Sequence, residues 1–170
     1  MYSNQLKLHL SIEHEFSYVD EIFNERFTRI TQVKHNEIQN IYAKRILLID
    51  INDKTHDSFI YVCENLIDYQ RKIPFLLPTI FIIEPKENVM PALLTPYYDK
   101  RSLRDLIAKQ ANGSILDEFN EPKKIILLYC LSAFLENLHS NSKFHGKFKA
   151  SNIIIDKNYY PFVSDLFLYM

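Results

Sequence analysis

The chain has 170 residues, a length that suits one domain with a hydrophobic core and is too short for two domains of ordinary size. Its 20 Lys and Arg residues nearly balance 21 Asp and Glu residues, and the net charge of −1 gives the chain as a whole no attraction for polyanions. Hydrophobic residues make up 47% and charged residues 24%, which excludes a disordered chain. We therefore expect a folded protein whose partner is neither a nucleic acid nor a membrane.

Targeting signals and cysteine usage indicate the compartment. The N-terminal residues contain no sustained apolar run, and the apolar runs at 80–83 and 125–131 are too short to cross a bilayer. Cys63 and Cys130 stand alone, without the Cys or His spacing of a metal site. Isolated thiols of this kind are typical of a reducing compartment, so we expect a cytoplasmic protein.

Residues 16–51 predict three β-strands that follow one another in the sheet. β-branched and aromatic residues dominate this segment, and the polar run HNEIQN at 35–40 interrupts it as a turn would. Residues 1–15 lack such a pattern, and we treat them as an N-terminal extension outside the fold.

A single helix and two further strands are expected next. Residues 56–69 carry apolar side chains at helical spacing, with Asp57 or Ser58 as the expected cap. Apolar segments at 76–85 and 90–98 follow, separated by a charged turn. The pattern predicts an antiparallel five-stranded sheet with one packed helix over residues 16–98.

The remainder of the chain predicts a mainly helical region. A helix at 102–109 begins with Ser102 as its cap, and a longer one at 122–140 begins with proline. Segments 152–156 and 162–168 resemble a short hairpin. The order of elements indicates an α+β fold with an upper lobe at 16–98, a partial lower lobe at 99–170, and a connecting segment near 95–100.

The strongest motif lies in this last region. The sequence HGKFKASN at 145–152 is followed by three isoleucines and then by DLF at 165–167. It resembles the catalytic loop and metal-binding hairpin of protein kinases, His-Arg-Asp-Leu-Lys-Pro-x-Asn followed by Asp-Phe-Gly. Residues 21–47 and 93–107 resemble the glycine-rich loop with the third strand, and the hinge, of that family. The likeness covers about residues 16 to 168 and implies a protein-kinase-like domain.

The phosphate-binding loop of the family is altered here. The resemblance places Phe23, Glu25 and Thr28 where the family has glycines that let backbone N–H groups approach phosphates. Glu25 also adds negative charge where a polyphosphate would lie. Only two glycines occur in the chain, none before Gly113, so we expect an ordinary β-hairpin and at most weak binding of ATP and Mg²⁺.

The resemblance also assigns a set of nucleotide-binding positions. The third-strand lysine corresponds to Arg45, although a shift of one residue would place Lys44 there instead. Its helix partner corresponds to Glu64, while the apolar pattern of the helix favours Val62 at that position. In the hinge, Thr95 occupies the gatekeeper position, and the carbonyl of Pro96 and the N–H of Tyr98 correspond to the adenine contacts.

The catalytic loop has lost its proton acceptor but keeps other positions. Lys147 replaces the catalytic aspartate, and a protonated amine cannot accept a proton from a hydroxyl. Lys149 matches the loop lysine that contacts the transferred phosphate, and Asn152 and Asp165 match the two metal ligands. Both ligands could equally hold the loop and the hairpin together by hydrogen bonds. We therefore expect no catalytic residue.

Two classes of function follow from the resemblance. The first is a catalytically inactive kinase-like module that acts by binding; the second is an ATP-dependent protein serine/threonine or tyrosine kinase with degenerate motifs, or a truncated remnant of one. The chain ends at Met170, which implies that the activation segment and later helices are missing. We expect a protein partner, or the missing remainder of the lower lobe, to cover one apolar helix face, formed by Ile126, Leu127, Cys130 and Phe134.

Overall fold

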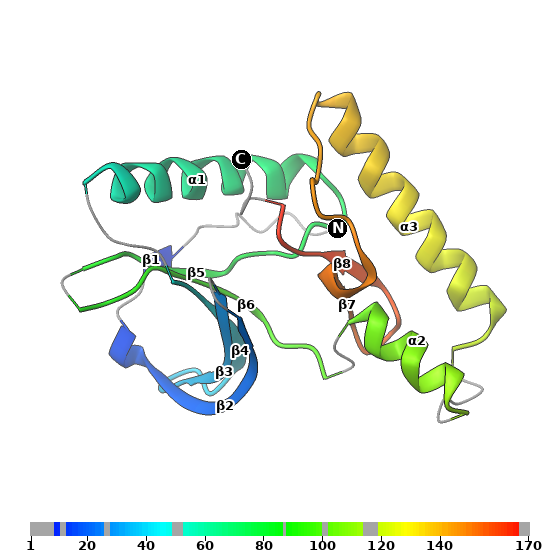
Figure 1. Cartoon of the computed structure of the whole chain (residues 1–170), viewed down its shortest axis with the longest axis horizontal. Coiled ribbons are helices and arrows are strands. Elements are labelled where there is room, and N and C mark those ends of the chain that lie inside the picture. Colours follow the sequence, from blue (N-terminus) through cyan, green and yellow to red (C-terminus); the bar gives the residue numbers. More distant parts are fainter. Residues whose placement is uncertain are drawn as a thin grey trace. The chain divides into compact units, whose positions relative to one another are not determined.

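The computed structural model describes residues 9–10, 13–25, 28–48, 53–86, 88–99, 102–113 and 119–166. The chain divides into two compact units, each made of two segments (Figure 1). The sheet unit consists of residues 1–68 and 78–97, and the helical unit of residues 69–77 and 98–170.

The sheet unit contains a six-stranded sheet in the order β1-β5-β6-β4-β3-β2. The strands are β1 (His9–Leu10), β2 (Phe16–Glu25), β3 (Thr28–His35), β4 (Ile41–Leu47), β5 (Phe81–Ile83) and β6 (Ala92–Pro96). Strands β2 to β6 pair antiparallel throughout, which confirms the predicted five-stranded sheet.

The N-terminal segment was predicted to lie outside the fold, and it contributes a sixth strand. His9 and Leu10 pair parallel with Phe81 and Ile82 of β5. A short 3-10 helix, η1 (Glu13–Glu15), then leads into β2. Strand β1 was not predicted, because a strand of two residues has too few positions to display an alternating pattern.

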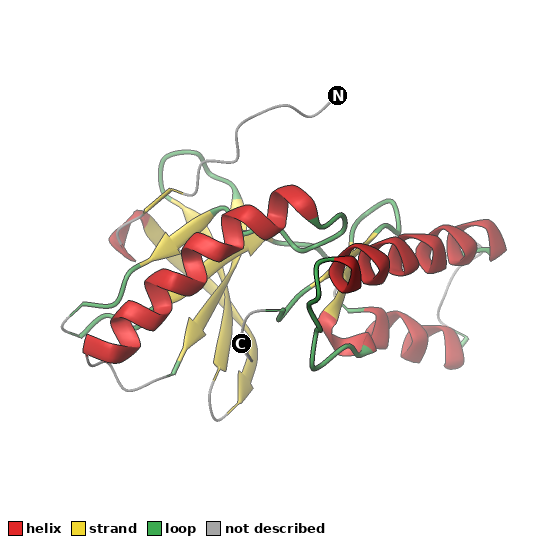
Figure 2. Cartoon of the chain, turned by 90° about the horizontal axis from the view of Figure 1, so that it is seen from above, coloured by secondary structure: helices red, strands yellow, loops and turns green. Residues whose placement is uncertain are grey.

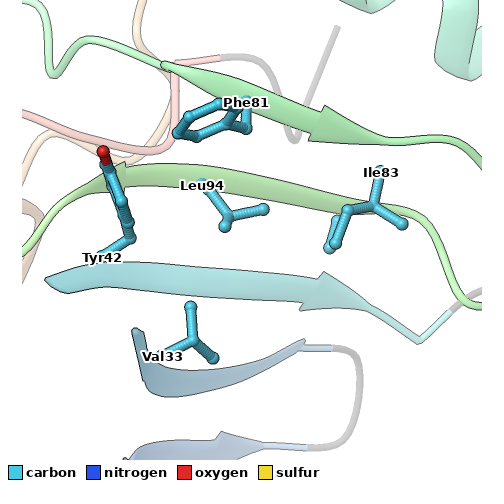
Figure 3. Close-up of a cluster of buried hydrophobic side chains, with 6 residues drawn as sticks. Val33, Tyr42, Phe81, Ile83 and Leu94 are labelled. Atoms are coloured by element: carbon cyan, nitrogen blue, oxygen red, sulfur yellow. The ribbon is translucent and has the colours of Figure 1, made fainter. Parts of the chain in front are cut away.

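One face of the sheet carries the hydrophobic core of this unit. Alternate residues of the strands supply it, as the period of two in a β-strand requires. Figure 3 shows the cluster, which consists of Val33, Tyr42, Phe81, Ile83, Ala92 and Leu94. Phe16 at the start of β2 packs against it, with its ring edge-on to the rings of Tyr42 and Phe81.

Helix α1 (Asp53–Lys72) is longer than the predicted helix at 56–69. Its buried side chains Phe59, Cys63 and Leu66 follow the predicted helical spacing. The helix begins before Asp57, so the prediction that Asp57 or Ser58 caps it was wrong. Propensity alone locates helix ends poorly, because the first turn is fixed by local capping contacts. Figure 2 shows α1 as one unbroken helix.

The helical unit contains α2 (Leu103–Ala111) and α3 (Glu121–Ser140), close to their predicted positions. Ser102 caps α2 in a reciprocal capping box with Asp105, and Asn120 caps α3 through its side chain. A 3-10 turn, η2 (Ala150–Asn152), precedes the hairpin of β7 (Ile153–Ile155) and β8 (Pro161–Val163). The second strand is shorter than predicted, because the chain leaves the ladder after Val163.

Helix α3 buries the face that was expected to lack cover. Leu127, Cys130 and Phe134 are buried, and Ile126 alone of the four predicted residues is exposed. The exposed apolar side chains lie on the opposite side, at Ile125, Leu128 and Tyr129, of which Tyr129 is 72% exposed. The prediction failed because the run Ile125–Leu131 is apolar almost all round, so the sequence did not reveal which side faces the core.

Within the described part of the chain, none of the helices combines the length and the apolarity that crossing a bilayer requires.

Candidate functional site

The centre of the candidate site is His145, in the loop that follows α3. Its imidazole is only 3% exposed and lies 2.7 Å, through Nε2, from the carbonyl oxygen of Ser164. The backbone N–H of Lys147 donates to Nδ1 at 3.2 Å. Because Nδ1 accepts, Nε2 must carry the proton that binds the Ser164 carbonyl. Both ring nitrogens are therefore occupied in holding the loop, and His145 is unsuited to act as a base.

Asn152 joins the same loop to the hairpin through three hydrogen bonds. Its buried amide Nδ2 donates to the carbonyl of Lys147 at 3.0 Å. Its own carbonyl accepts from the backbone N–H of Ser164 at 2.8 Å and from the Ser164 hydroxyl at 3.1 Å. We call His145, Lys147, Asn152 and Ser164 the loop frame. The frame holds Lys147 through its backbone, and leaves the side-chain oxygen Oδ1 of Asn152 as the atom suited to a metal.

Asp165 directly follows the frame and has an unusual backbone conformation. Its φ is 68°, in the left-handed region that Asp adopts more readily than most residues. The side chain is half-buried. A backbone conformation of this kind persists only where the surroundings impose it, and such positions cluster at functional sites.

Strand β8, which leads to Asp165, is anchored to the loop after α1. The N–H of Val163 donates to the carbonyl of Phe75 at 2.7 Å, and the N–H of Leu77 donates to the carbonyl of Val163 at 2.9 Å. Phe75 itself has a φ of 60°, a strained value for a bulky residue. The sequence contained no signal for this anchor, because it depends on contacts between segments far apart in the chain.

The side chains of Lys147 and Lys149 are exposed, and the loop carries no carboxylate of its own. No Asp or Glu occurs between Asn137 and Ile155. A protonated lysine can neutralise an anion but cannot remove a proton from a hydroxyl group at neutral pH. The chemistry available at the loop itself is thus anion binding.

In the sheet unit, Arg45 and Lys44 lie on opposite faces of β4. Lys44 lies opposite Leu94, on the face of the hydrophobic cluster, and Arg45 lies half-buried opposite Leu93. The Lys44 side chain is 8% exposed, and its Nζ lies 2.6 Å from Oε1 of Glu13. Sequence reasoning missed this ion pair because 31 positions separate the two residues.

Glu64 is exposed on α1, next to the buried Cys63. Burial, together with the carboxylates of Glu84 and Glu64, raises the pKa of the Cys63 thiol to about 12. A thiol of this kind stays protonated and unreactive at neutral pH. Thr95 and Pro96, the last two residues of β6, are half-buried and lie opposite Ala43 and Tyr42 of β4.

Tyr98 belongs to the helical unit and is fixed against the hairpin. Its ring stacks on Phe162 of β8, with centroids 5.4 Å apart and planes inclined by 8°. Burial first, and the Asp156 carboxylate second, raise the pKa of the Tyr98 hydroxyl. The stack holds the Tyr98 ring against β8.

The positions of the three family glycines lie in the β2–β3 hairpin. Phe23 pairs with Ile30, and Glu25 pairs with Thr28. The backbone follows an antiparallel ladder with two register shifts, one between Tyr18 and Asp20 and one between Glu21 and Phe23. The side chain of Glu25 lies outside the described residues, so the predicted effect of its charge stays a prediction.

A pocket of about 420 Å³ also lies in the sheet unit, and it is lined by other residues. Phe16, Ile83 and Val89 form its apolar part, and Glu13 and Glu84 are among its polar residues. None of the residues predicted to bind nucleotide lines this pocket.

The predicted residues are thus divided between the two units. Arg45, Glu64, Thr95 and Pro96 belong to the sheet unit; Tyr98, Lys147, Lys149, Asn152 and Asp165 belong to the helical unit. Among the described residues, no group of three or more His, Cys, Asp or Glu side chains could hold a metal ion. No protein-family model matches the chain, and no curated protein matches it.

Proposed function

We propose that this chain is a protein-kinase-like domain that lacks phosphotransfer activity and acts by binding. The observation that carries the proposal is the loop frame, in which His145, Asn152 and Ser164 hold a loop whose central residue is Lys147. The frame supplies the positioning that a catalytic loop needs. The residue that it positions cannot perform the proton transfer, so the frame serves to maintain the fold.

The proposed absence of phosphotransfer activity follows from the groups that phosphoryl transfer requires. The reaction needs a loop over the phosphates, a cation, ligands for Mg²⁺, and a carboxylate near the acceptor hydroxyl. Asn152 and Asp165 are residue types that bind Mg²⁺. Lys147 would instead repel the metal ion, and its amine takes the place of the carboxylate. We propose that any site for ATP and Mg²⁺ here is weak.

A titration with Mg-ATP tests the proposal directly. A ligand that binds only the native state raises stability by RT ln(1 + [L]/Kd). With a Kd of 1 mM or weaker, 1 mM Mg-ATP would add at most about 0.4 kcal/mol, which is about 1 °C in melting temperature for a chain of this size. A larger shift, with calorimetry giving a Kd in the low micromolar range or better, would overturn the proposal of weak binding.

A second candidate is a protein kinase with degenerate motifs. The left-handed backbone at Asp165 favours it, because such strain is often retained for a ligand. Replacement of Asp165 by Ala separates the two candidates. In a degenerate kinase the variant loses the stabilisation by Mg-ATP that the wild type shows, whereas in a binding module both proteins respond equally weakly.

We also propose a cytoplasmic location and a protein partner. Both described cysteines are free and buried, which suits a reducing compartment. The exposed apolar side chains Ile125, Leu128 and Tyr129 give α3 a surface that a partner protein could cover.

A further inference from the structure

The loop after α3 alternates basic and aromatic residues over seven positions. We call residues 143–149, with the sequence KFHGKFK, the basic-aromatic loop. Phe144 is 78% exposed and Phe148 is 40% exposed, and Lys147 and Lys149 are exposed beside them. The sequence from Asn137 to Ile155 contains three lysines and no carboxylate, although the net charge of the chain is −1.

The two exposed rings are held in defined orientations. Phe148 stacks on the fully buried Phe134, with planes inclined by 10° and centroids 6.1 Å apart, and meets His145 edge-on at 5.8 Å. Phe144 lies against His139, with ring centroids 5.6 Å apart. Rings whose orientation is already fixed lose little conformational entropy when a flat ligand stacks on them.

The lysines are placed around these rings. Lys143 precedes Phe144, and its Nζ lies 5.9 Å from the ring centroid of Tyr69, which restrains its position. Lys147 and Lys149 flank Phe148 in sequence. Cations that alternate with aromatic rings match a chain in which charged phosphates alternate with flat bases.

We propose that the basic-aromatic loop binds single-stranded nucleic acid, with bases stacked on Phe144 and Phe148 and with phosphates near the lysines. Stacking of bases on aromatic side chains beside a cationic surface is how proteins bind single strands without sequence preference. The net charge of −1 led us to expect no nucleic-acid partner. The three lysines of this loop, in a stretch of sequence without carboxylates, favour such a partner instead. The inference goes beyond the proposed function and does not depend on the kinase resemblance.

Two other anionic partners fit the loop less well. Binding to an anionic membrane usually needs a cluster of about four to eight Lys or Arg residues, and this loop has three lysines. An acidic peptide would use the charges but gives no role to two oriented rings, because carboxylates do not stack. The combination of rings and cations therefore favours the nucleic acid.

Fluorescence anisotropy with a labelled 12-nucleotide oligouridine tests the proposal on the full chain. Phe144→Ala removes an exposed ring without disturbing the core, and should weaken binding about tenfold or more. The control Phe23→Ala removes another exposed ring, on β2, and should leave the affinity unchanged. Circular dichroism of each variant verifies that it is folded.

Salt dependence supplies a second and independent readout. The slope of log K against log[salt] should fall by about 0.7 in Lys149→Gln, as expected when one phosphate contact with a single strand is lost. Lys109→Gln, an exposed position on α2, should leave the slope unchanged. Equal affinities of wild type and Phe144→Ala would overturn the proposal. An absence of oligouridine binding would also overturn the proposal, even if phosphatidylserine vesicles or polyglutamate bound to the protein.

Discussion

The β2–β3 hairpin and the loop frame differ in how far they match the proposed kinase-like assignment. In the hairpin, Phe23 and Thr28 stand in an ordinary ladder where the family resemblance would require glycines. In the loop frame, His145 and Asn152 still form hydrogen bonds with Ser164 and Lys147. The hairpin has no need of the glycines unless phosphates approach its backbone, whereas the frame residues are needed for folding whether or not a reaction takes place.

This difference indicates which constraints act on the chain. A buried polar group that loses its partner is destabilising by about 1–3 kcal/mol, a large share of the free energy of unfolding of a small protein. An exposed residue in a hairpin is usually worth less than about 0.5 kcal/mol. On the proposed assignment, residues with a structural role are therefore retained by folding alone, and a position with a purely chemical role, which we propose for residue 147, is free to change.

Replacement of His145 by Ala should produce the largest effect on stability. It removes both hydrogen bonds of the imidazole and leaves the buried carbonyl of Ser164 without its donor. We expect a loss of about 2–4 kcal/mol in the free energy of unfolding, measured by urea denaturation. In the hairpin, Phe23→Ala should change it by less than about 0.5 kcal/mol. Similar losses for the two variants would contradict the contrast between these regions.

The Glu13–Lys44 ion pair tests whether the sheet unit depends on its N-terminal segment. Glu13→Ala leaves the buried Lys44 ammonium without its carboxylate and should lower the free energy of unfolding by about 1–2 kcal/mol. Lys44→Met should stay within about 0.5 kcal/mol of the wild type, because an apolar side chain of similar size replaces the charge.

The double variant completes a cycle for this pair. Glu13→Ala combined with Lys44→Met should be about as stable as Lys44→Met alone, since no buried charge remains without a partner. A loss equal to the sum of the two single changes would show that the two side chains do not act as a pair.

Cys63 gives a smaller effect that depends on pH. Its pKa of about 12 in the fold exceeds the ordinary value of 9.0, so the protonated thiol stabilises the fold fully below pH 9. This contribution is lost as the pH rises through the range from about 9 to about 12. Between pH 7 and pH 10, the free energy of unfolding of the wild type should fall by roughly 1 kcal/mol more than that of Cys63→Ala. A difference between the two proteins that is independent of pH would contradict the shift.

The antiparallel sheet was predictable because each of its longer strands displays an alternating pattern that burial imposes locally. Strand β1 and the contact of Glu13 with Lys44 were not, because both depend on pairing between segments far apart in the sequence. The buried side of α3 was mispredicted since its apolar residues surround the helix. Patterns report which residues are apolar, and tertiary packing decides which of them face the core.

Parts of the candidate site could also be predicted from the motif. The motif located the loop and the hairpin. The loss of the proton acceptor at Lys147 and the role of Asp165 as a metal ligand stay predictions. The left-handed backbone at Asp165 and the role of Ser164 were not predictable, because they arise from hydrogen bonds that form only after the hairpin has packed.

The most direct test of the account is incorporation of radiolabel from ATP into the chain itself and into a generic protein substrate. Wild type, Lys147→Asp and Asp165→Ala should be compared side by side. The account predicts no incorporation by any of them, because restoring one carboxylate leaves the glycine-free hairpin unchanged. Label incorporated by the wild type and abolished by Asp165→Ala would contradict the account, and would show that Asp165 holds a working metal ion.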